Sequence, residues 1–194
     1  MTYTIPRYPV HLIDVMRVAD GRRITIRPTL PQDLGLQREF FRSLSPSARY
    51  DRFMTAINEL PESLWERFAS ADHRTHLALL AEVFDGSGEV MIGEARYVVD
   101  ERDPSTCEFA VAVADRWRAC GLGRELLYRL ERQAAASGIR RMVADTLIAN
   151  KAMIGLAACT GYSVRANRDD AKLAKLEKIL MSLSAPLLLQ PQAA

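Results

Sequence analysis

The sequence lacks the charge bias and the long apolar runs that mark several classes of protein. Its 194 residues carry 26 Lys and Arg against 24 Asp and Glu, so the net charge is only +2, which does not suggest nucleic-acid binding. The longest apolar runs, such as His76–Phe84, are far too short to span a bilayer. Met1–Val15 lacks the apolar stretch of a secretory signal. We therefore expect a cytoplasmic protein with no nucleic-acid or membrane partner.

Cysteine is also scarce. The chain has Cys107, Cys120 and Cys159, an odd number with no pair at the spacing of metal ligands. Free cysteines mostly behave as small apolar residues, and we expect this role here. His73 and His76 form an H-x-x-H pair, but no cysteine pair accompanies it, so we expect no metal site. A chain of this length, with 48% apolar residues, can build a core without metals or disulfides.

The periodicity of apolar residues predicts an alternation of strands and helices. Asp20-Gly21 separates two alternating apolar runs, which is a strong hairpin signal. Thr29 and Gln32 are spaced as in a helix capping box. The expected elements, in chain order, are a hairpin over 15–27, helices that start near 31, 46 and 61, strands at 76–84, 90–99 and 107–113, a helix from the glycine turn at 121–123 to Ser137-Gly138, a strand at 141–148, a helix at 150–160 and a strand from 162.

This order predicts an α/β (α+β) architecture with one sheet flanked by helices. No internal repeat and no domain boundary is apparent, so we expect a single domain over residues 1–194. Its size is compatible with a monomer or a homodimer.

The C-terminal segment is ambiguous. Leu173, Leu176 and Leu180 have helical spacing, whereas a sheet would require Leu176–Met181 to be extended. Residues 184–194 contain two prolines, and we expect them to form a loose tail.

The most informative stretch is RACGLGR at 118–124, between a predicted strand and a predicted helix. Glycines let the backbone approach a ligand closely, and the first N–H groups of a helix are unsatisfied at the positive end of its dipole. Such a turn can bind a phosphate, and Arg116, Arg118 and Arg124 add positive charge. Leu126 stands where a dinucleotide fingerprint needs its third glycine, and the Gly-Lys-Ser/Thr of a P-loop is absent.

This stretch resembles the acetyl-CoA signature of the GNAT superfamily of N-acetyltransferases, Arg/Gln-x-x-Gly-x-Gly/Ala. As in that family, the preceding strand ends at Val113, five residues before the arginine, and Asn150 lies eleven residues before Gly161-Tyr162. The resemblance covers about Arg23 to Val164. It implies a GNAT fold, with a mixed and mostly antiparallel sheet splayed around the acetyl-CoA site, a recognisable core over about 23–165, acetyl-CoA as cosubstrate, and no metal.

Further segments resemble the GNAT domain of bacterial protein-lysine acetyltransferases. That branch includes GNAT domains attached to cyclic-nucleotide-binding or acyl-CoA-synthetase-like modules. The 194 residues leave no room for either module, so the resemblance implies a stand-alone catalytic domain. It also favours a protein substrate. The segments are Tyr8-Pro9-x-His11-Leu12, Ile24-x-Ile26-Arg27-Pro28 after the hairpin, Leu44-Ser45-Pro46-x-x-Arg49-Tyr50-x-Arg52-Phe53, and Glu108-Phe109-Ala110.

Acetyl transfer to an amine needs a base, because a lysine-like amine has a pKa of about 10.4 and is protonated at neutral pH. Glu108 is the candidate. Strand alternation places Glu108 and the alanines that follow it on one face, and Phe109, Val111 and Val113 on the other. An exposed glutamate without a catalytic role is the alternative, and the Glu-Phe-Ala resemblance favours the base.

The resemblance also implies which residues hold the cofactor. In the family, the pantetheine arm pairs with the strand before the glycine turn like an added strand. Asn150 is a cofactor contact by resemblance, and a helix N-cap is its other possible role. The expected cofactor-binding residues are Val111, Ala112, Val113, Arg118, Ala119, Cys120, Gly121, Leu122, Gly123, Arg124 and Asn150.

Three functions remain open at this stage: acetyl transfer to a protein lysine, acetyl transfer to a small-molecule amine, and non-catalytic CoA binding as a sensor. Glu108 favours an enzyme, since a sensor needs no base. An acidic acceptor groove would favour a small amine, but the acidic residues near Glu94 are mixed with arginines. Residues 49–52 either line the acceptor side or form a solvated helix. Many family members have a tyrosine as the acid for the leaving thiolate where this chain has Ala157, so the proton would come from solvent.

Overall fold

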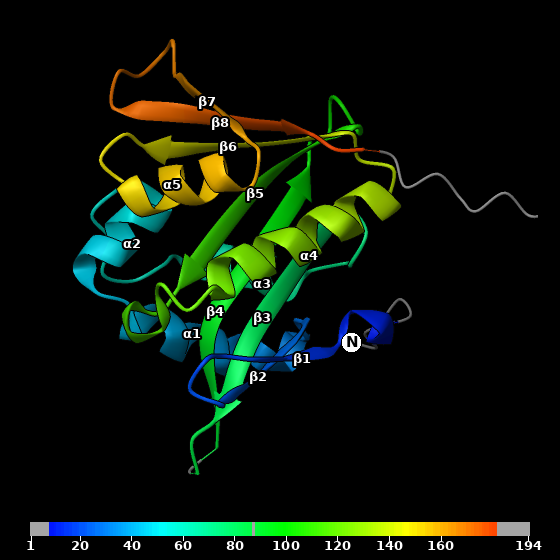
Figure 1. The fold of residues 1–194 in the computed structure, drawn as a ribbon, viewed down its shortest axis with the longest axis vertical. Coiled ribbons are helices and arrows are strands. Elements are labelled where there is room, and N and C mark those ends of the chain that lie inside the picture. Colours follow the sequence, from blue (N-terminus) through cyan, green and yellow to red (C-terminus); the bar gives the residue numbers. More distant parts are fainter. Residues whose placement is uncertain (1–7, 87, 182–194) are drawn as a thin grey trace, which may run out of the picture.

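The computed structural model describes residues 8–86 and 88–181, which form one eight-stranded sheet with helices on both faces (Figure 1). The strand order is β1-β2-β3-β4-β5-β6-β8-β7, and every neighbouring pair is antiparallel except β5 and β6. The predicted mixed, mostly antiparallel sheet is therefore confirmed. The predicted tail at 184–194 lies outside the described residues.

The predicted order of elements agrees with the structure. The strands are β1 Asp14–Arg17, β2 Arg23–Pro28, β3 His76–Phe84, β4 Glu89–Val99, β5 Thr106–Val113, β6 Arg141–Leu147, β7 Ser163–Ala166 and β8 Leu173–Ile179. The helices are α1 Leu34–Ser43, α2 Pro46–Phe53, α3 Glu62–Ala69, α4 Leu122–Ala136 and α5 Lys151–Cys159, with 3-10 turns at Val10–Leu12, Pro31–Asp33 and Asp115–Trp117. The ambiguous C-terminal segment is thus a strand, β8.

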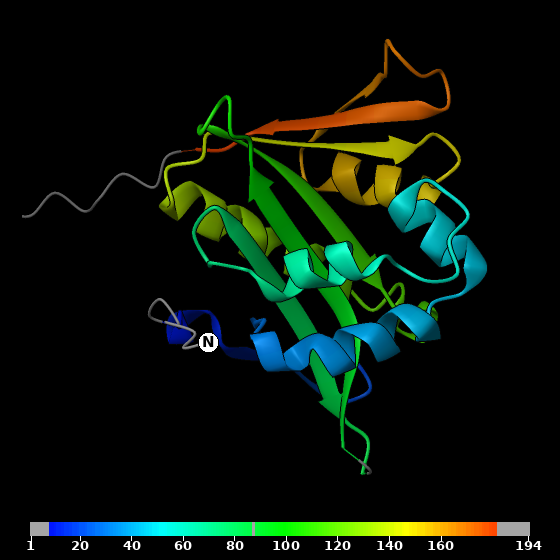
Figure 2. The ribbon, with the colours of Figure 1, turned by 180° about the vertical axis from the view of Figure 1, so that it is seen from behind.

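Helices α4 and α5 cover one face of the sheet, and α1, α2 and α3 lie on the other (Figures 1 and 2). The apolar stripe of α4 is buried against β3, β4 and β5 and consists of Leu122, Leu126, Leu127, Leu130 and Ala134. Each buried leucine contributes about 1.5–3 kcal/mol. Gly93 on β4 permits this approach, because a Cβ there would meet Leu126 Cδ1 at 3.2 Å. On the opposite face, Phe40 of α1 packs on Leu80 and Met91.

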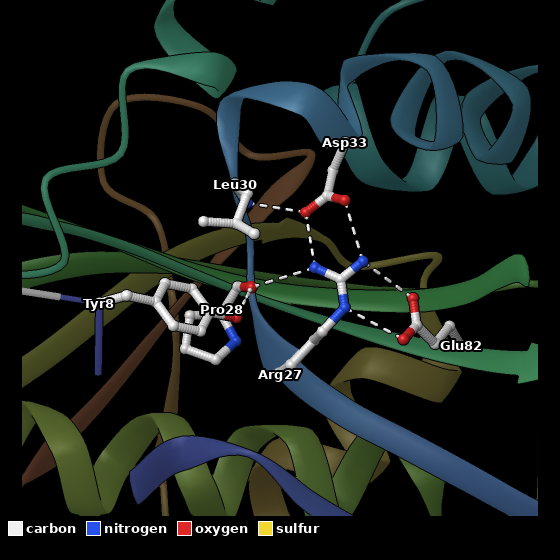
Figure 3. Close-up of polar contacts among 6 residues, drawn as sticks. All are labelled: Tyr8, Arg27, Pro28, Leu30, Asp33 and Glu82. Carbon is white, nitrogen blue, oxygen red and sulfur yellow. Dashed lines mark hydrogen bonds and ion pairs between the residues drawn. The ribbon is translucent and has the colours of Figure 1, made fainter. Parts of the chain in front are cut away.

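The capping box predicted at Thr29 and Gln32 is wrong. The Oγ of Thr29 is buried and has no partner among the described residues. The side chain at the start of this helical segment that accepts a hydrogen bond is Asp33, whose carboxylate takes the N–H of Leu30 at 2.7 Å (Figure 3). Asp33 also accepts from Arg27, whose guanidinium reaches across to Glu82 on β3. Asp33 thus belongs to an ion network with Arg27 and Glu82. The local spacing of Thr29 and Gln32 does not reveal this network.

The sheet opens between β5 and β6. These strands pair only where Thr106–Glu108 meets Arg141–Val143, although β5 runs on to Val113 and β6 to Leu147. β6 stays paired with β8 along its whole length, so it follows β8 and diverges from β5. Beyond Glu108, the β6-facing edge of β5 therefore has no strand partner in the described part of the chain. Free N–H and C=O groups on such an edge can pair with an extended ligand.

The cysteines and the H-x-x-H pair lie in environments that are typical of residues that support the fold. All three cysteines are free, and burial raises the pKa of Cys107 to about 12, as suits a core thiol. His73 is buried with the ring of Tyr8 edge-on to it at 5.7 Å. Across 8–86 and 88–181, no group of three or more His, Cys, Asp or Glu side chains could hold a metal ion, and no helix is long and apolar enough to cross a membrane.

Candidate functional site

The gap between β5 and β6 opens into a cavity of about 270 Å³. Its walls come from the end of β5, the glycine turn that leads into α4, the start of α5 and one side of α2. Nine of the predicted cofactor residues line it: Val111, Ala112, Val113, Arg118, Ala119, Gly121, Gly123, Arg124 and Asn150.

The two remaining predicted residues do not line the cavity. The thiol of Cys120 donates to the carbonyl of Trp117 at 3.0 Å and packs against the core. Leu122 has its side chain fully in the core, as part of the α4 stripe. What these positions can offer a ligand is their backbone N–H, which is what a phosphate-binding turn uses.

The glycine turn is curled by two residues in the left-handed region, Ala119 at φ 60° and Gly121 at φ 87°. For alanine this conformation costs about 1–2 kcal/mol, and such strain tends to collect at functional sites. Within the described residues, no acceptor takes the N–H groups of Gly121, Leu122, Gly123 or Arg124. A Cβ at Gly121 would meet nothing within 4 Å, so the space beside it is open. The turn therefore has the free N–H groups and the open space that an anion site needs.

Arg118 and the start of α2 are tied to this turn by Asp115. Its carboxylate pairs with Arg118 at 3.2 Å and accepts from the backbone N–H and Oγ of Ser45 at 3.0 and 3.1 Å. Burial would raise the pKa of Asp115, but the hydrogen bonds from Ser45 and the charge of Arg118 hold it below its ordinary value. Ser45 also caps α2 by accepting from the N–H of Ala48, at the predicted start of this helix. One carboxylate thus fixes two walls of the cavity.

Asn150 is the N-cap of α5. Its Oδ1 accepts the N–H of Met153 at 3.0 Å, so the capping role is confirmed. The residue also lines the cavity, and its amide nitrogen donates to no group in the described part of the chain. The same side chain can therefore hold the helix start and present an N–H to a ligand.

Glu108 lies outside this cavity, in a neighbouring hollow of about 410 Å³ between β4, β5 and the helices α2 and α3. It is exposed, whereas Phe109 turns to the other face and packs on Tyr162 with ring centroids 5.0 Å apart. The β4–β5 register has no shift, so the predicted alternation is confirmed. Arg52 of α2 lines both hollows and stands where they meet.

A buried ion cluster lies beside Glu108, and its pairing does not follow from the sequence. Glu94, only 6% exposed, accepts from Arg96 at 2.7 Å and from Arg52 at 3.4 Å. The guanidinium of Arg96 lies 3.5 Å from the ring centroid of Phe68. Burial alone would raise the pKa of Glu94, but the two arginines outweigh it and lower the pKa. The surroundings of Glu94 therefore do not form the acidic groove that would favour a small amine, because two arginines pair with the Glu94 carboxylate.

Comparison with known proteins identifies the family. The model of the acetyltransferase (GNAT) family matches residues 38–162, well over half of the chain. The chain belongs to the acetyltransferase (GNAT) family. An acetyltransferase of Pseudomonas aeruginosa is 31% identical over 152 residues, which cover 78% of this chain and 81% of that protein. The open β5 edge and the glycine turn are thus parts of a GNAT domain.

Solved structures agree with this GNAT assignment. The GNAT domain of PAT from S. lividans superposes with a TM-score of 0.81 at 25% identity, covering 90% of this chain and all of that chain. A Salmonella typhimurium protein, solved with its cofactor acetyl-CoA, has a TM-score of 0.65 at 22% identity and covers 84% of this chain and 97% of its own. The latter likeness shows the fold alone.

Proposed function

We propose that this GNAT protein transfers an acetyl group from acetyl-CoA to the side-chain amine of a protein lysine, with Glu108 as general base. One observation carries the proposal. A single cavity links the anion-binding turn to the open edge of β5, and the hollow that holds Glu108 meets this cavity at Arg52.

The cavity fits the parts of acetyl-CoA. The turn at 118–124 offers free N–H groups and arginines to a pyrophosphate. The unpaired edge of β5 beyond Glu108 offers backbone groups to the amides of a pantetheine arm. Gly123 adds no side chain, and a Cβ there would already contact Leu156 and Val113 at 3.6 and 3.7 Å, so a larger residue would narrow the cavity.

Acetyl-CoA supplies a thioester carbonyl that the neutral amine attacks. The new bond joins the amine nitrogen to the acetyl carbon, the carbon–sulfur bond breaks, and the thiolate takes a proton from solvent. Glu108 accepts the proton that the amine loses, directly or through a water, because it is exposed in the hollow where the acceptor enters. Backbone N–H groups of Val111–Val113 are the candidates to stabilise the carbonyl oxygen.

The surroundings of Glu108 favour a polypeptide over a small polyamine. Arg52, Arg67 and Arg96 line the hollow together with Glu108 and Asp100, and Glu94 pairs with Arg52 and Arg96. The hollow therefore carries no excess of negative charge that would attract a small polycation, whereas a single lysine side chain can enter from a bound polypeptide. The sequence resemblance to the protein-lysine branch supports the same acceptor.

The test is a transfer assay with isotope-labelled acetyl-CoA, read by mass spectrometry. A panel of small amines and a panel of lysine-bearing proteins and peptides are offered in parallel. We expect label on protein lysines together with release of free CoA. Label on small amines alone would overturn the lysine acceptor, and tight CoA binding with no transfer to any amine would support the sensor instead.

A further inference from the structure

We propose that the protein has a buried polar subsite behind its acyl site, formed by Gln37 and Arg52, which accepts acyl-CoA donors whose short acyl group ends in a carboxylate. This inference rests on the proposed acyl transfer and extends it to a second class of donor.

The subsite is a void of about 20 Å³ between α1, α2, α3 and the sheet. It shares Leu44, Arg52 and Ala112 with the lining of the cofactor cavity, so the two spaces adjoin. Aromatic side chains form most of its wall, whereas Gln37, Arg52 and Glu94 are its polar groups. A void of this size has room for about one water, so one oxygen of a carboxylate can enter it.

Gln37 is the first indication of a ligand. The residue is 3% exposed, and neither its amide nitrogen nor its amide oxygen has a hydrogen-bond partner in the described part of the chain. An unpaired buried polar group costs about 1–3 kcal/mol, so each one calls for an explanation. A leucine would fill the same place in this apolar wall without that cost. The unpaired amide therefore indicates a polar occupant.

The charge of the cluster indicates the sign of that occupant. Arg52 and Arg96 share one carboxylate, Glu94, which leaves one positive charge in excess in a buried place. The Nε of Arg52 is buried and has no acceptor among the described residues. Arg52 also feels the charge of Glu108, but that carboxylate is exposed, and water screens it. An anion that entered from the cofactor cavity would neutralise the excess and accept from Arg52 and Gln37.

The experiment compares acetyl-, propionyl-, malonyl- and succinyl-CoA as donors to one lysine peptide, in the wild type and in Gln37→Leu. We expect the wild type to use at least one carboxylate-ended donor with a kcat/KM within about tenfold of acetyl-CoA. Gln37→Leu should lower that value by roughly 10- to 100-fold, the effect of one hydrogen bond to a charged group, and leave acetyl- and propionyl-CoA unchanged. Gln32→Leu, an exposed glutamine on the preceding turn, is the matched control.

A thermal-unfolding scan separates the outcomes. Gln37→Leu should be at least as stable as the wild type, because it removes unpaired buried polar atoms. If the void holds only a water, Gln37→Leu will change stability but not donor preference, and the proposal is overturned. Equal failure of malonyl- and succinyl-CoA with wild type, while acetyl-CoA reacts, also overturns it. Failure of all four donors would count against the acyl transfer itself.

Discussion

We expect cofactor binding to depend most on Gly121. Its φ of 87° favours glycine, and the space beside it is open to the cavity. Gly121→Glu should abolish acetyl-CoA binding, because it places bulk and negative charge where a pyrophosphate would lie. Calorimetry on the folded variant measures this.

Gly138, at the other end of α4, provides the control for that variant. It has nearly the same φ, 86°, and the same open surroundings, but it does not line the cavity. Both glutamate variants should lose a similar amount of stability, about 1–2 kcal/mol, and only Gly121→Glu should lose binding. Equal affinities in the two variants would remove the anion-site interpretation.

His76 makes the stability of the fold depend on pH. Burial, with help from the charge of Arg96, lowers its pKa from 6.5 to about 4. Between these values the unfolded chain binds a proton that the folded chain does not, so stability is present above pH 6.5 and falls as the pH drops toward 4. His76→Gln should reduce the fall in melting temperature between pH 7 and pH 5.

The matched control for His76 is His11→Gln, which changes an exposed histidine and should leave that fall in place. Burial also lowers the pKa of His73, so part of the fall should persist in His76→Gln. An unchanged pH dependence in His76→Gln would contradict the assignment.

Several residues of the site could not be predicted from local patterns. The glycine turn and Asn150 have a fixed spacing within a short stretch, so their places could be inferred. The Arg52–Glu94 pair joins residues 42 positions apart, and neither the charge of Arg52 nor its helix indicates such a partner. Gln37 sits on a helix face that otherwise reads as apolar, and only the packed structure reveals that its amide is unpaired.

At the scale of secondary elements, the start of α5 has two functions that can be separated. Asn150→Asp should keep the helix cap, because aspartate caps as well as asparagine, but it replaces an N–H donor in the cavity with a negative charge. We expect unchanged thermal stability and weaker acetyl-CoA binding. Asn150→Ala should lose both, with a cost of about 1 kcal/mol in stability. An Asn150→Asp enzyme with wild-type affinity would limit Asn150 to the cap.

The strand β8 shows why one element stayed ambiguous in the sequence. Leu176 and Ala174 point into the core, and Leu180 just beyond the strand is buried as well, so apolar residues recur at intervals that also suit a helix. Pairing with both β6 and β7 decides the matter, and strand pairing of this kind is not encoded in one segment alone. Helix α4 was predictable because one amphipathic period dominates it, and β3 because it is a short apolar run bounded by polar turns.

At the scale of the whole molecule, the opening between β5 and β6 leaves two spaces along β5 that share Arg52 in their walls. One is the proposed cofactor cavity and the other is the hollow of Glu108. A cofactor can therefore occupy its cavity while the acceptor amine approaches from the other hollow. This arrangement suits direct transfer without a covalent enzyme intermediate.

The most direct test of this account is the turnover of Glu108→Gln. The variant should keep its fold and its affinity for acetyl-CoA but lose roughly a hundred- to ten-thousand-fold in kcat, with part of the loss recovered at high pH, where more of the amine is neutral. Glu101→Gln, a change to an exposed glutamate in the loop before β5, should behave as the wild type. A Glu108→Gln enzyme within about twofold of the wild-type kcat, with the same pH profile, would contradict the proposed mechanism.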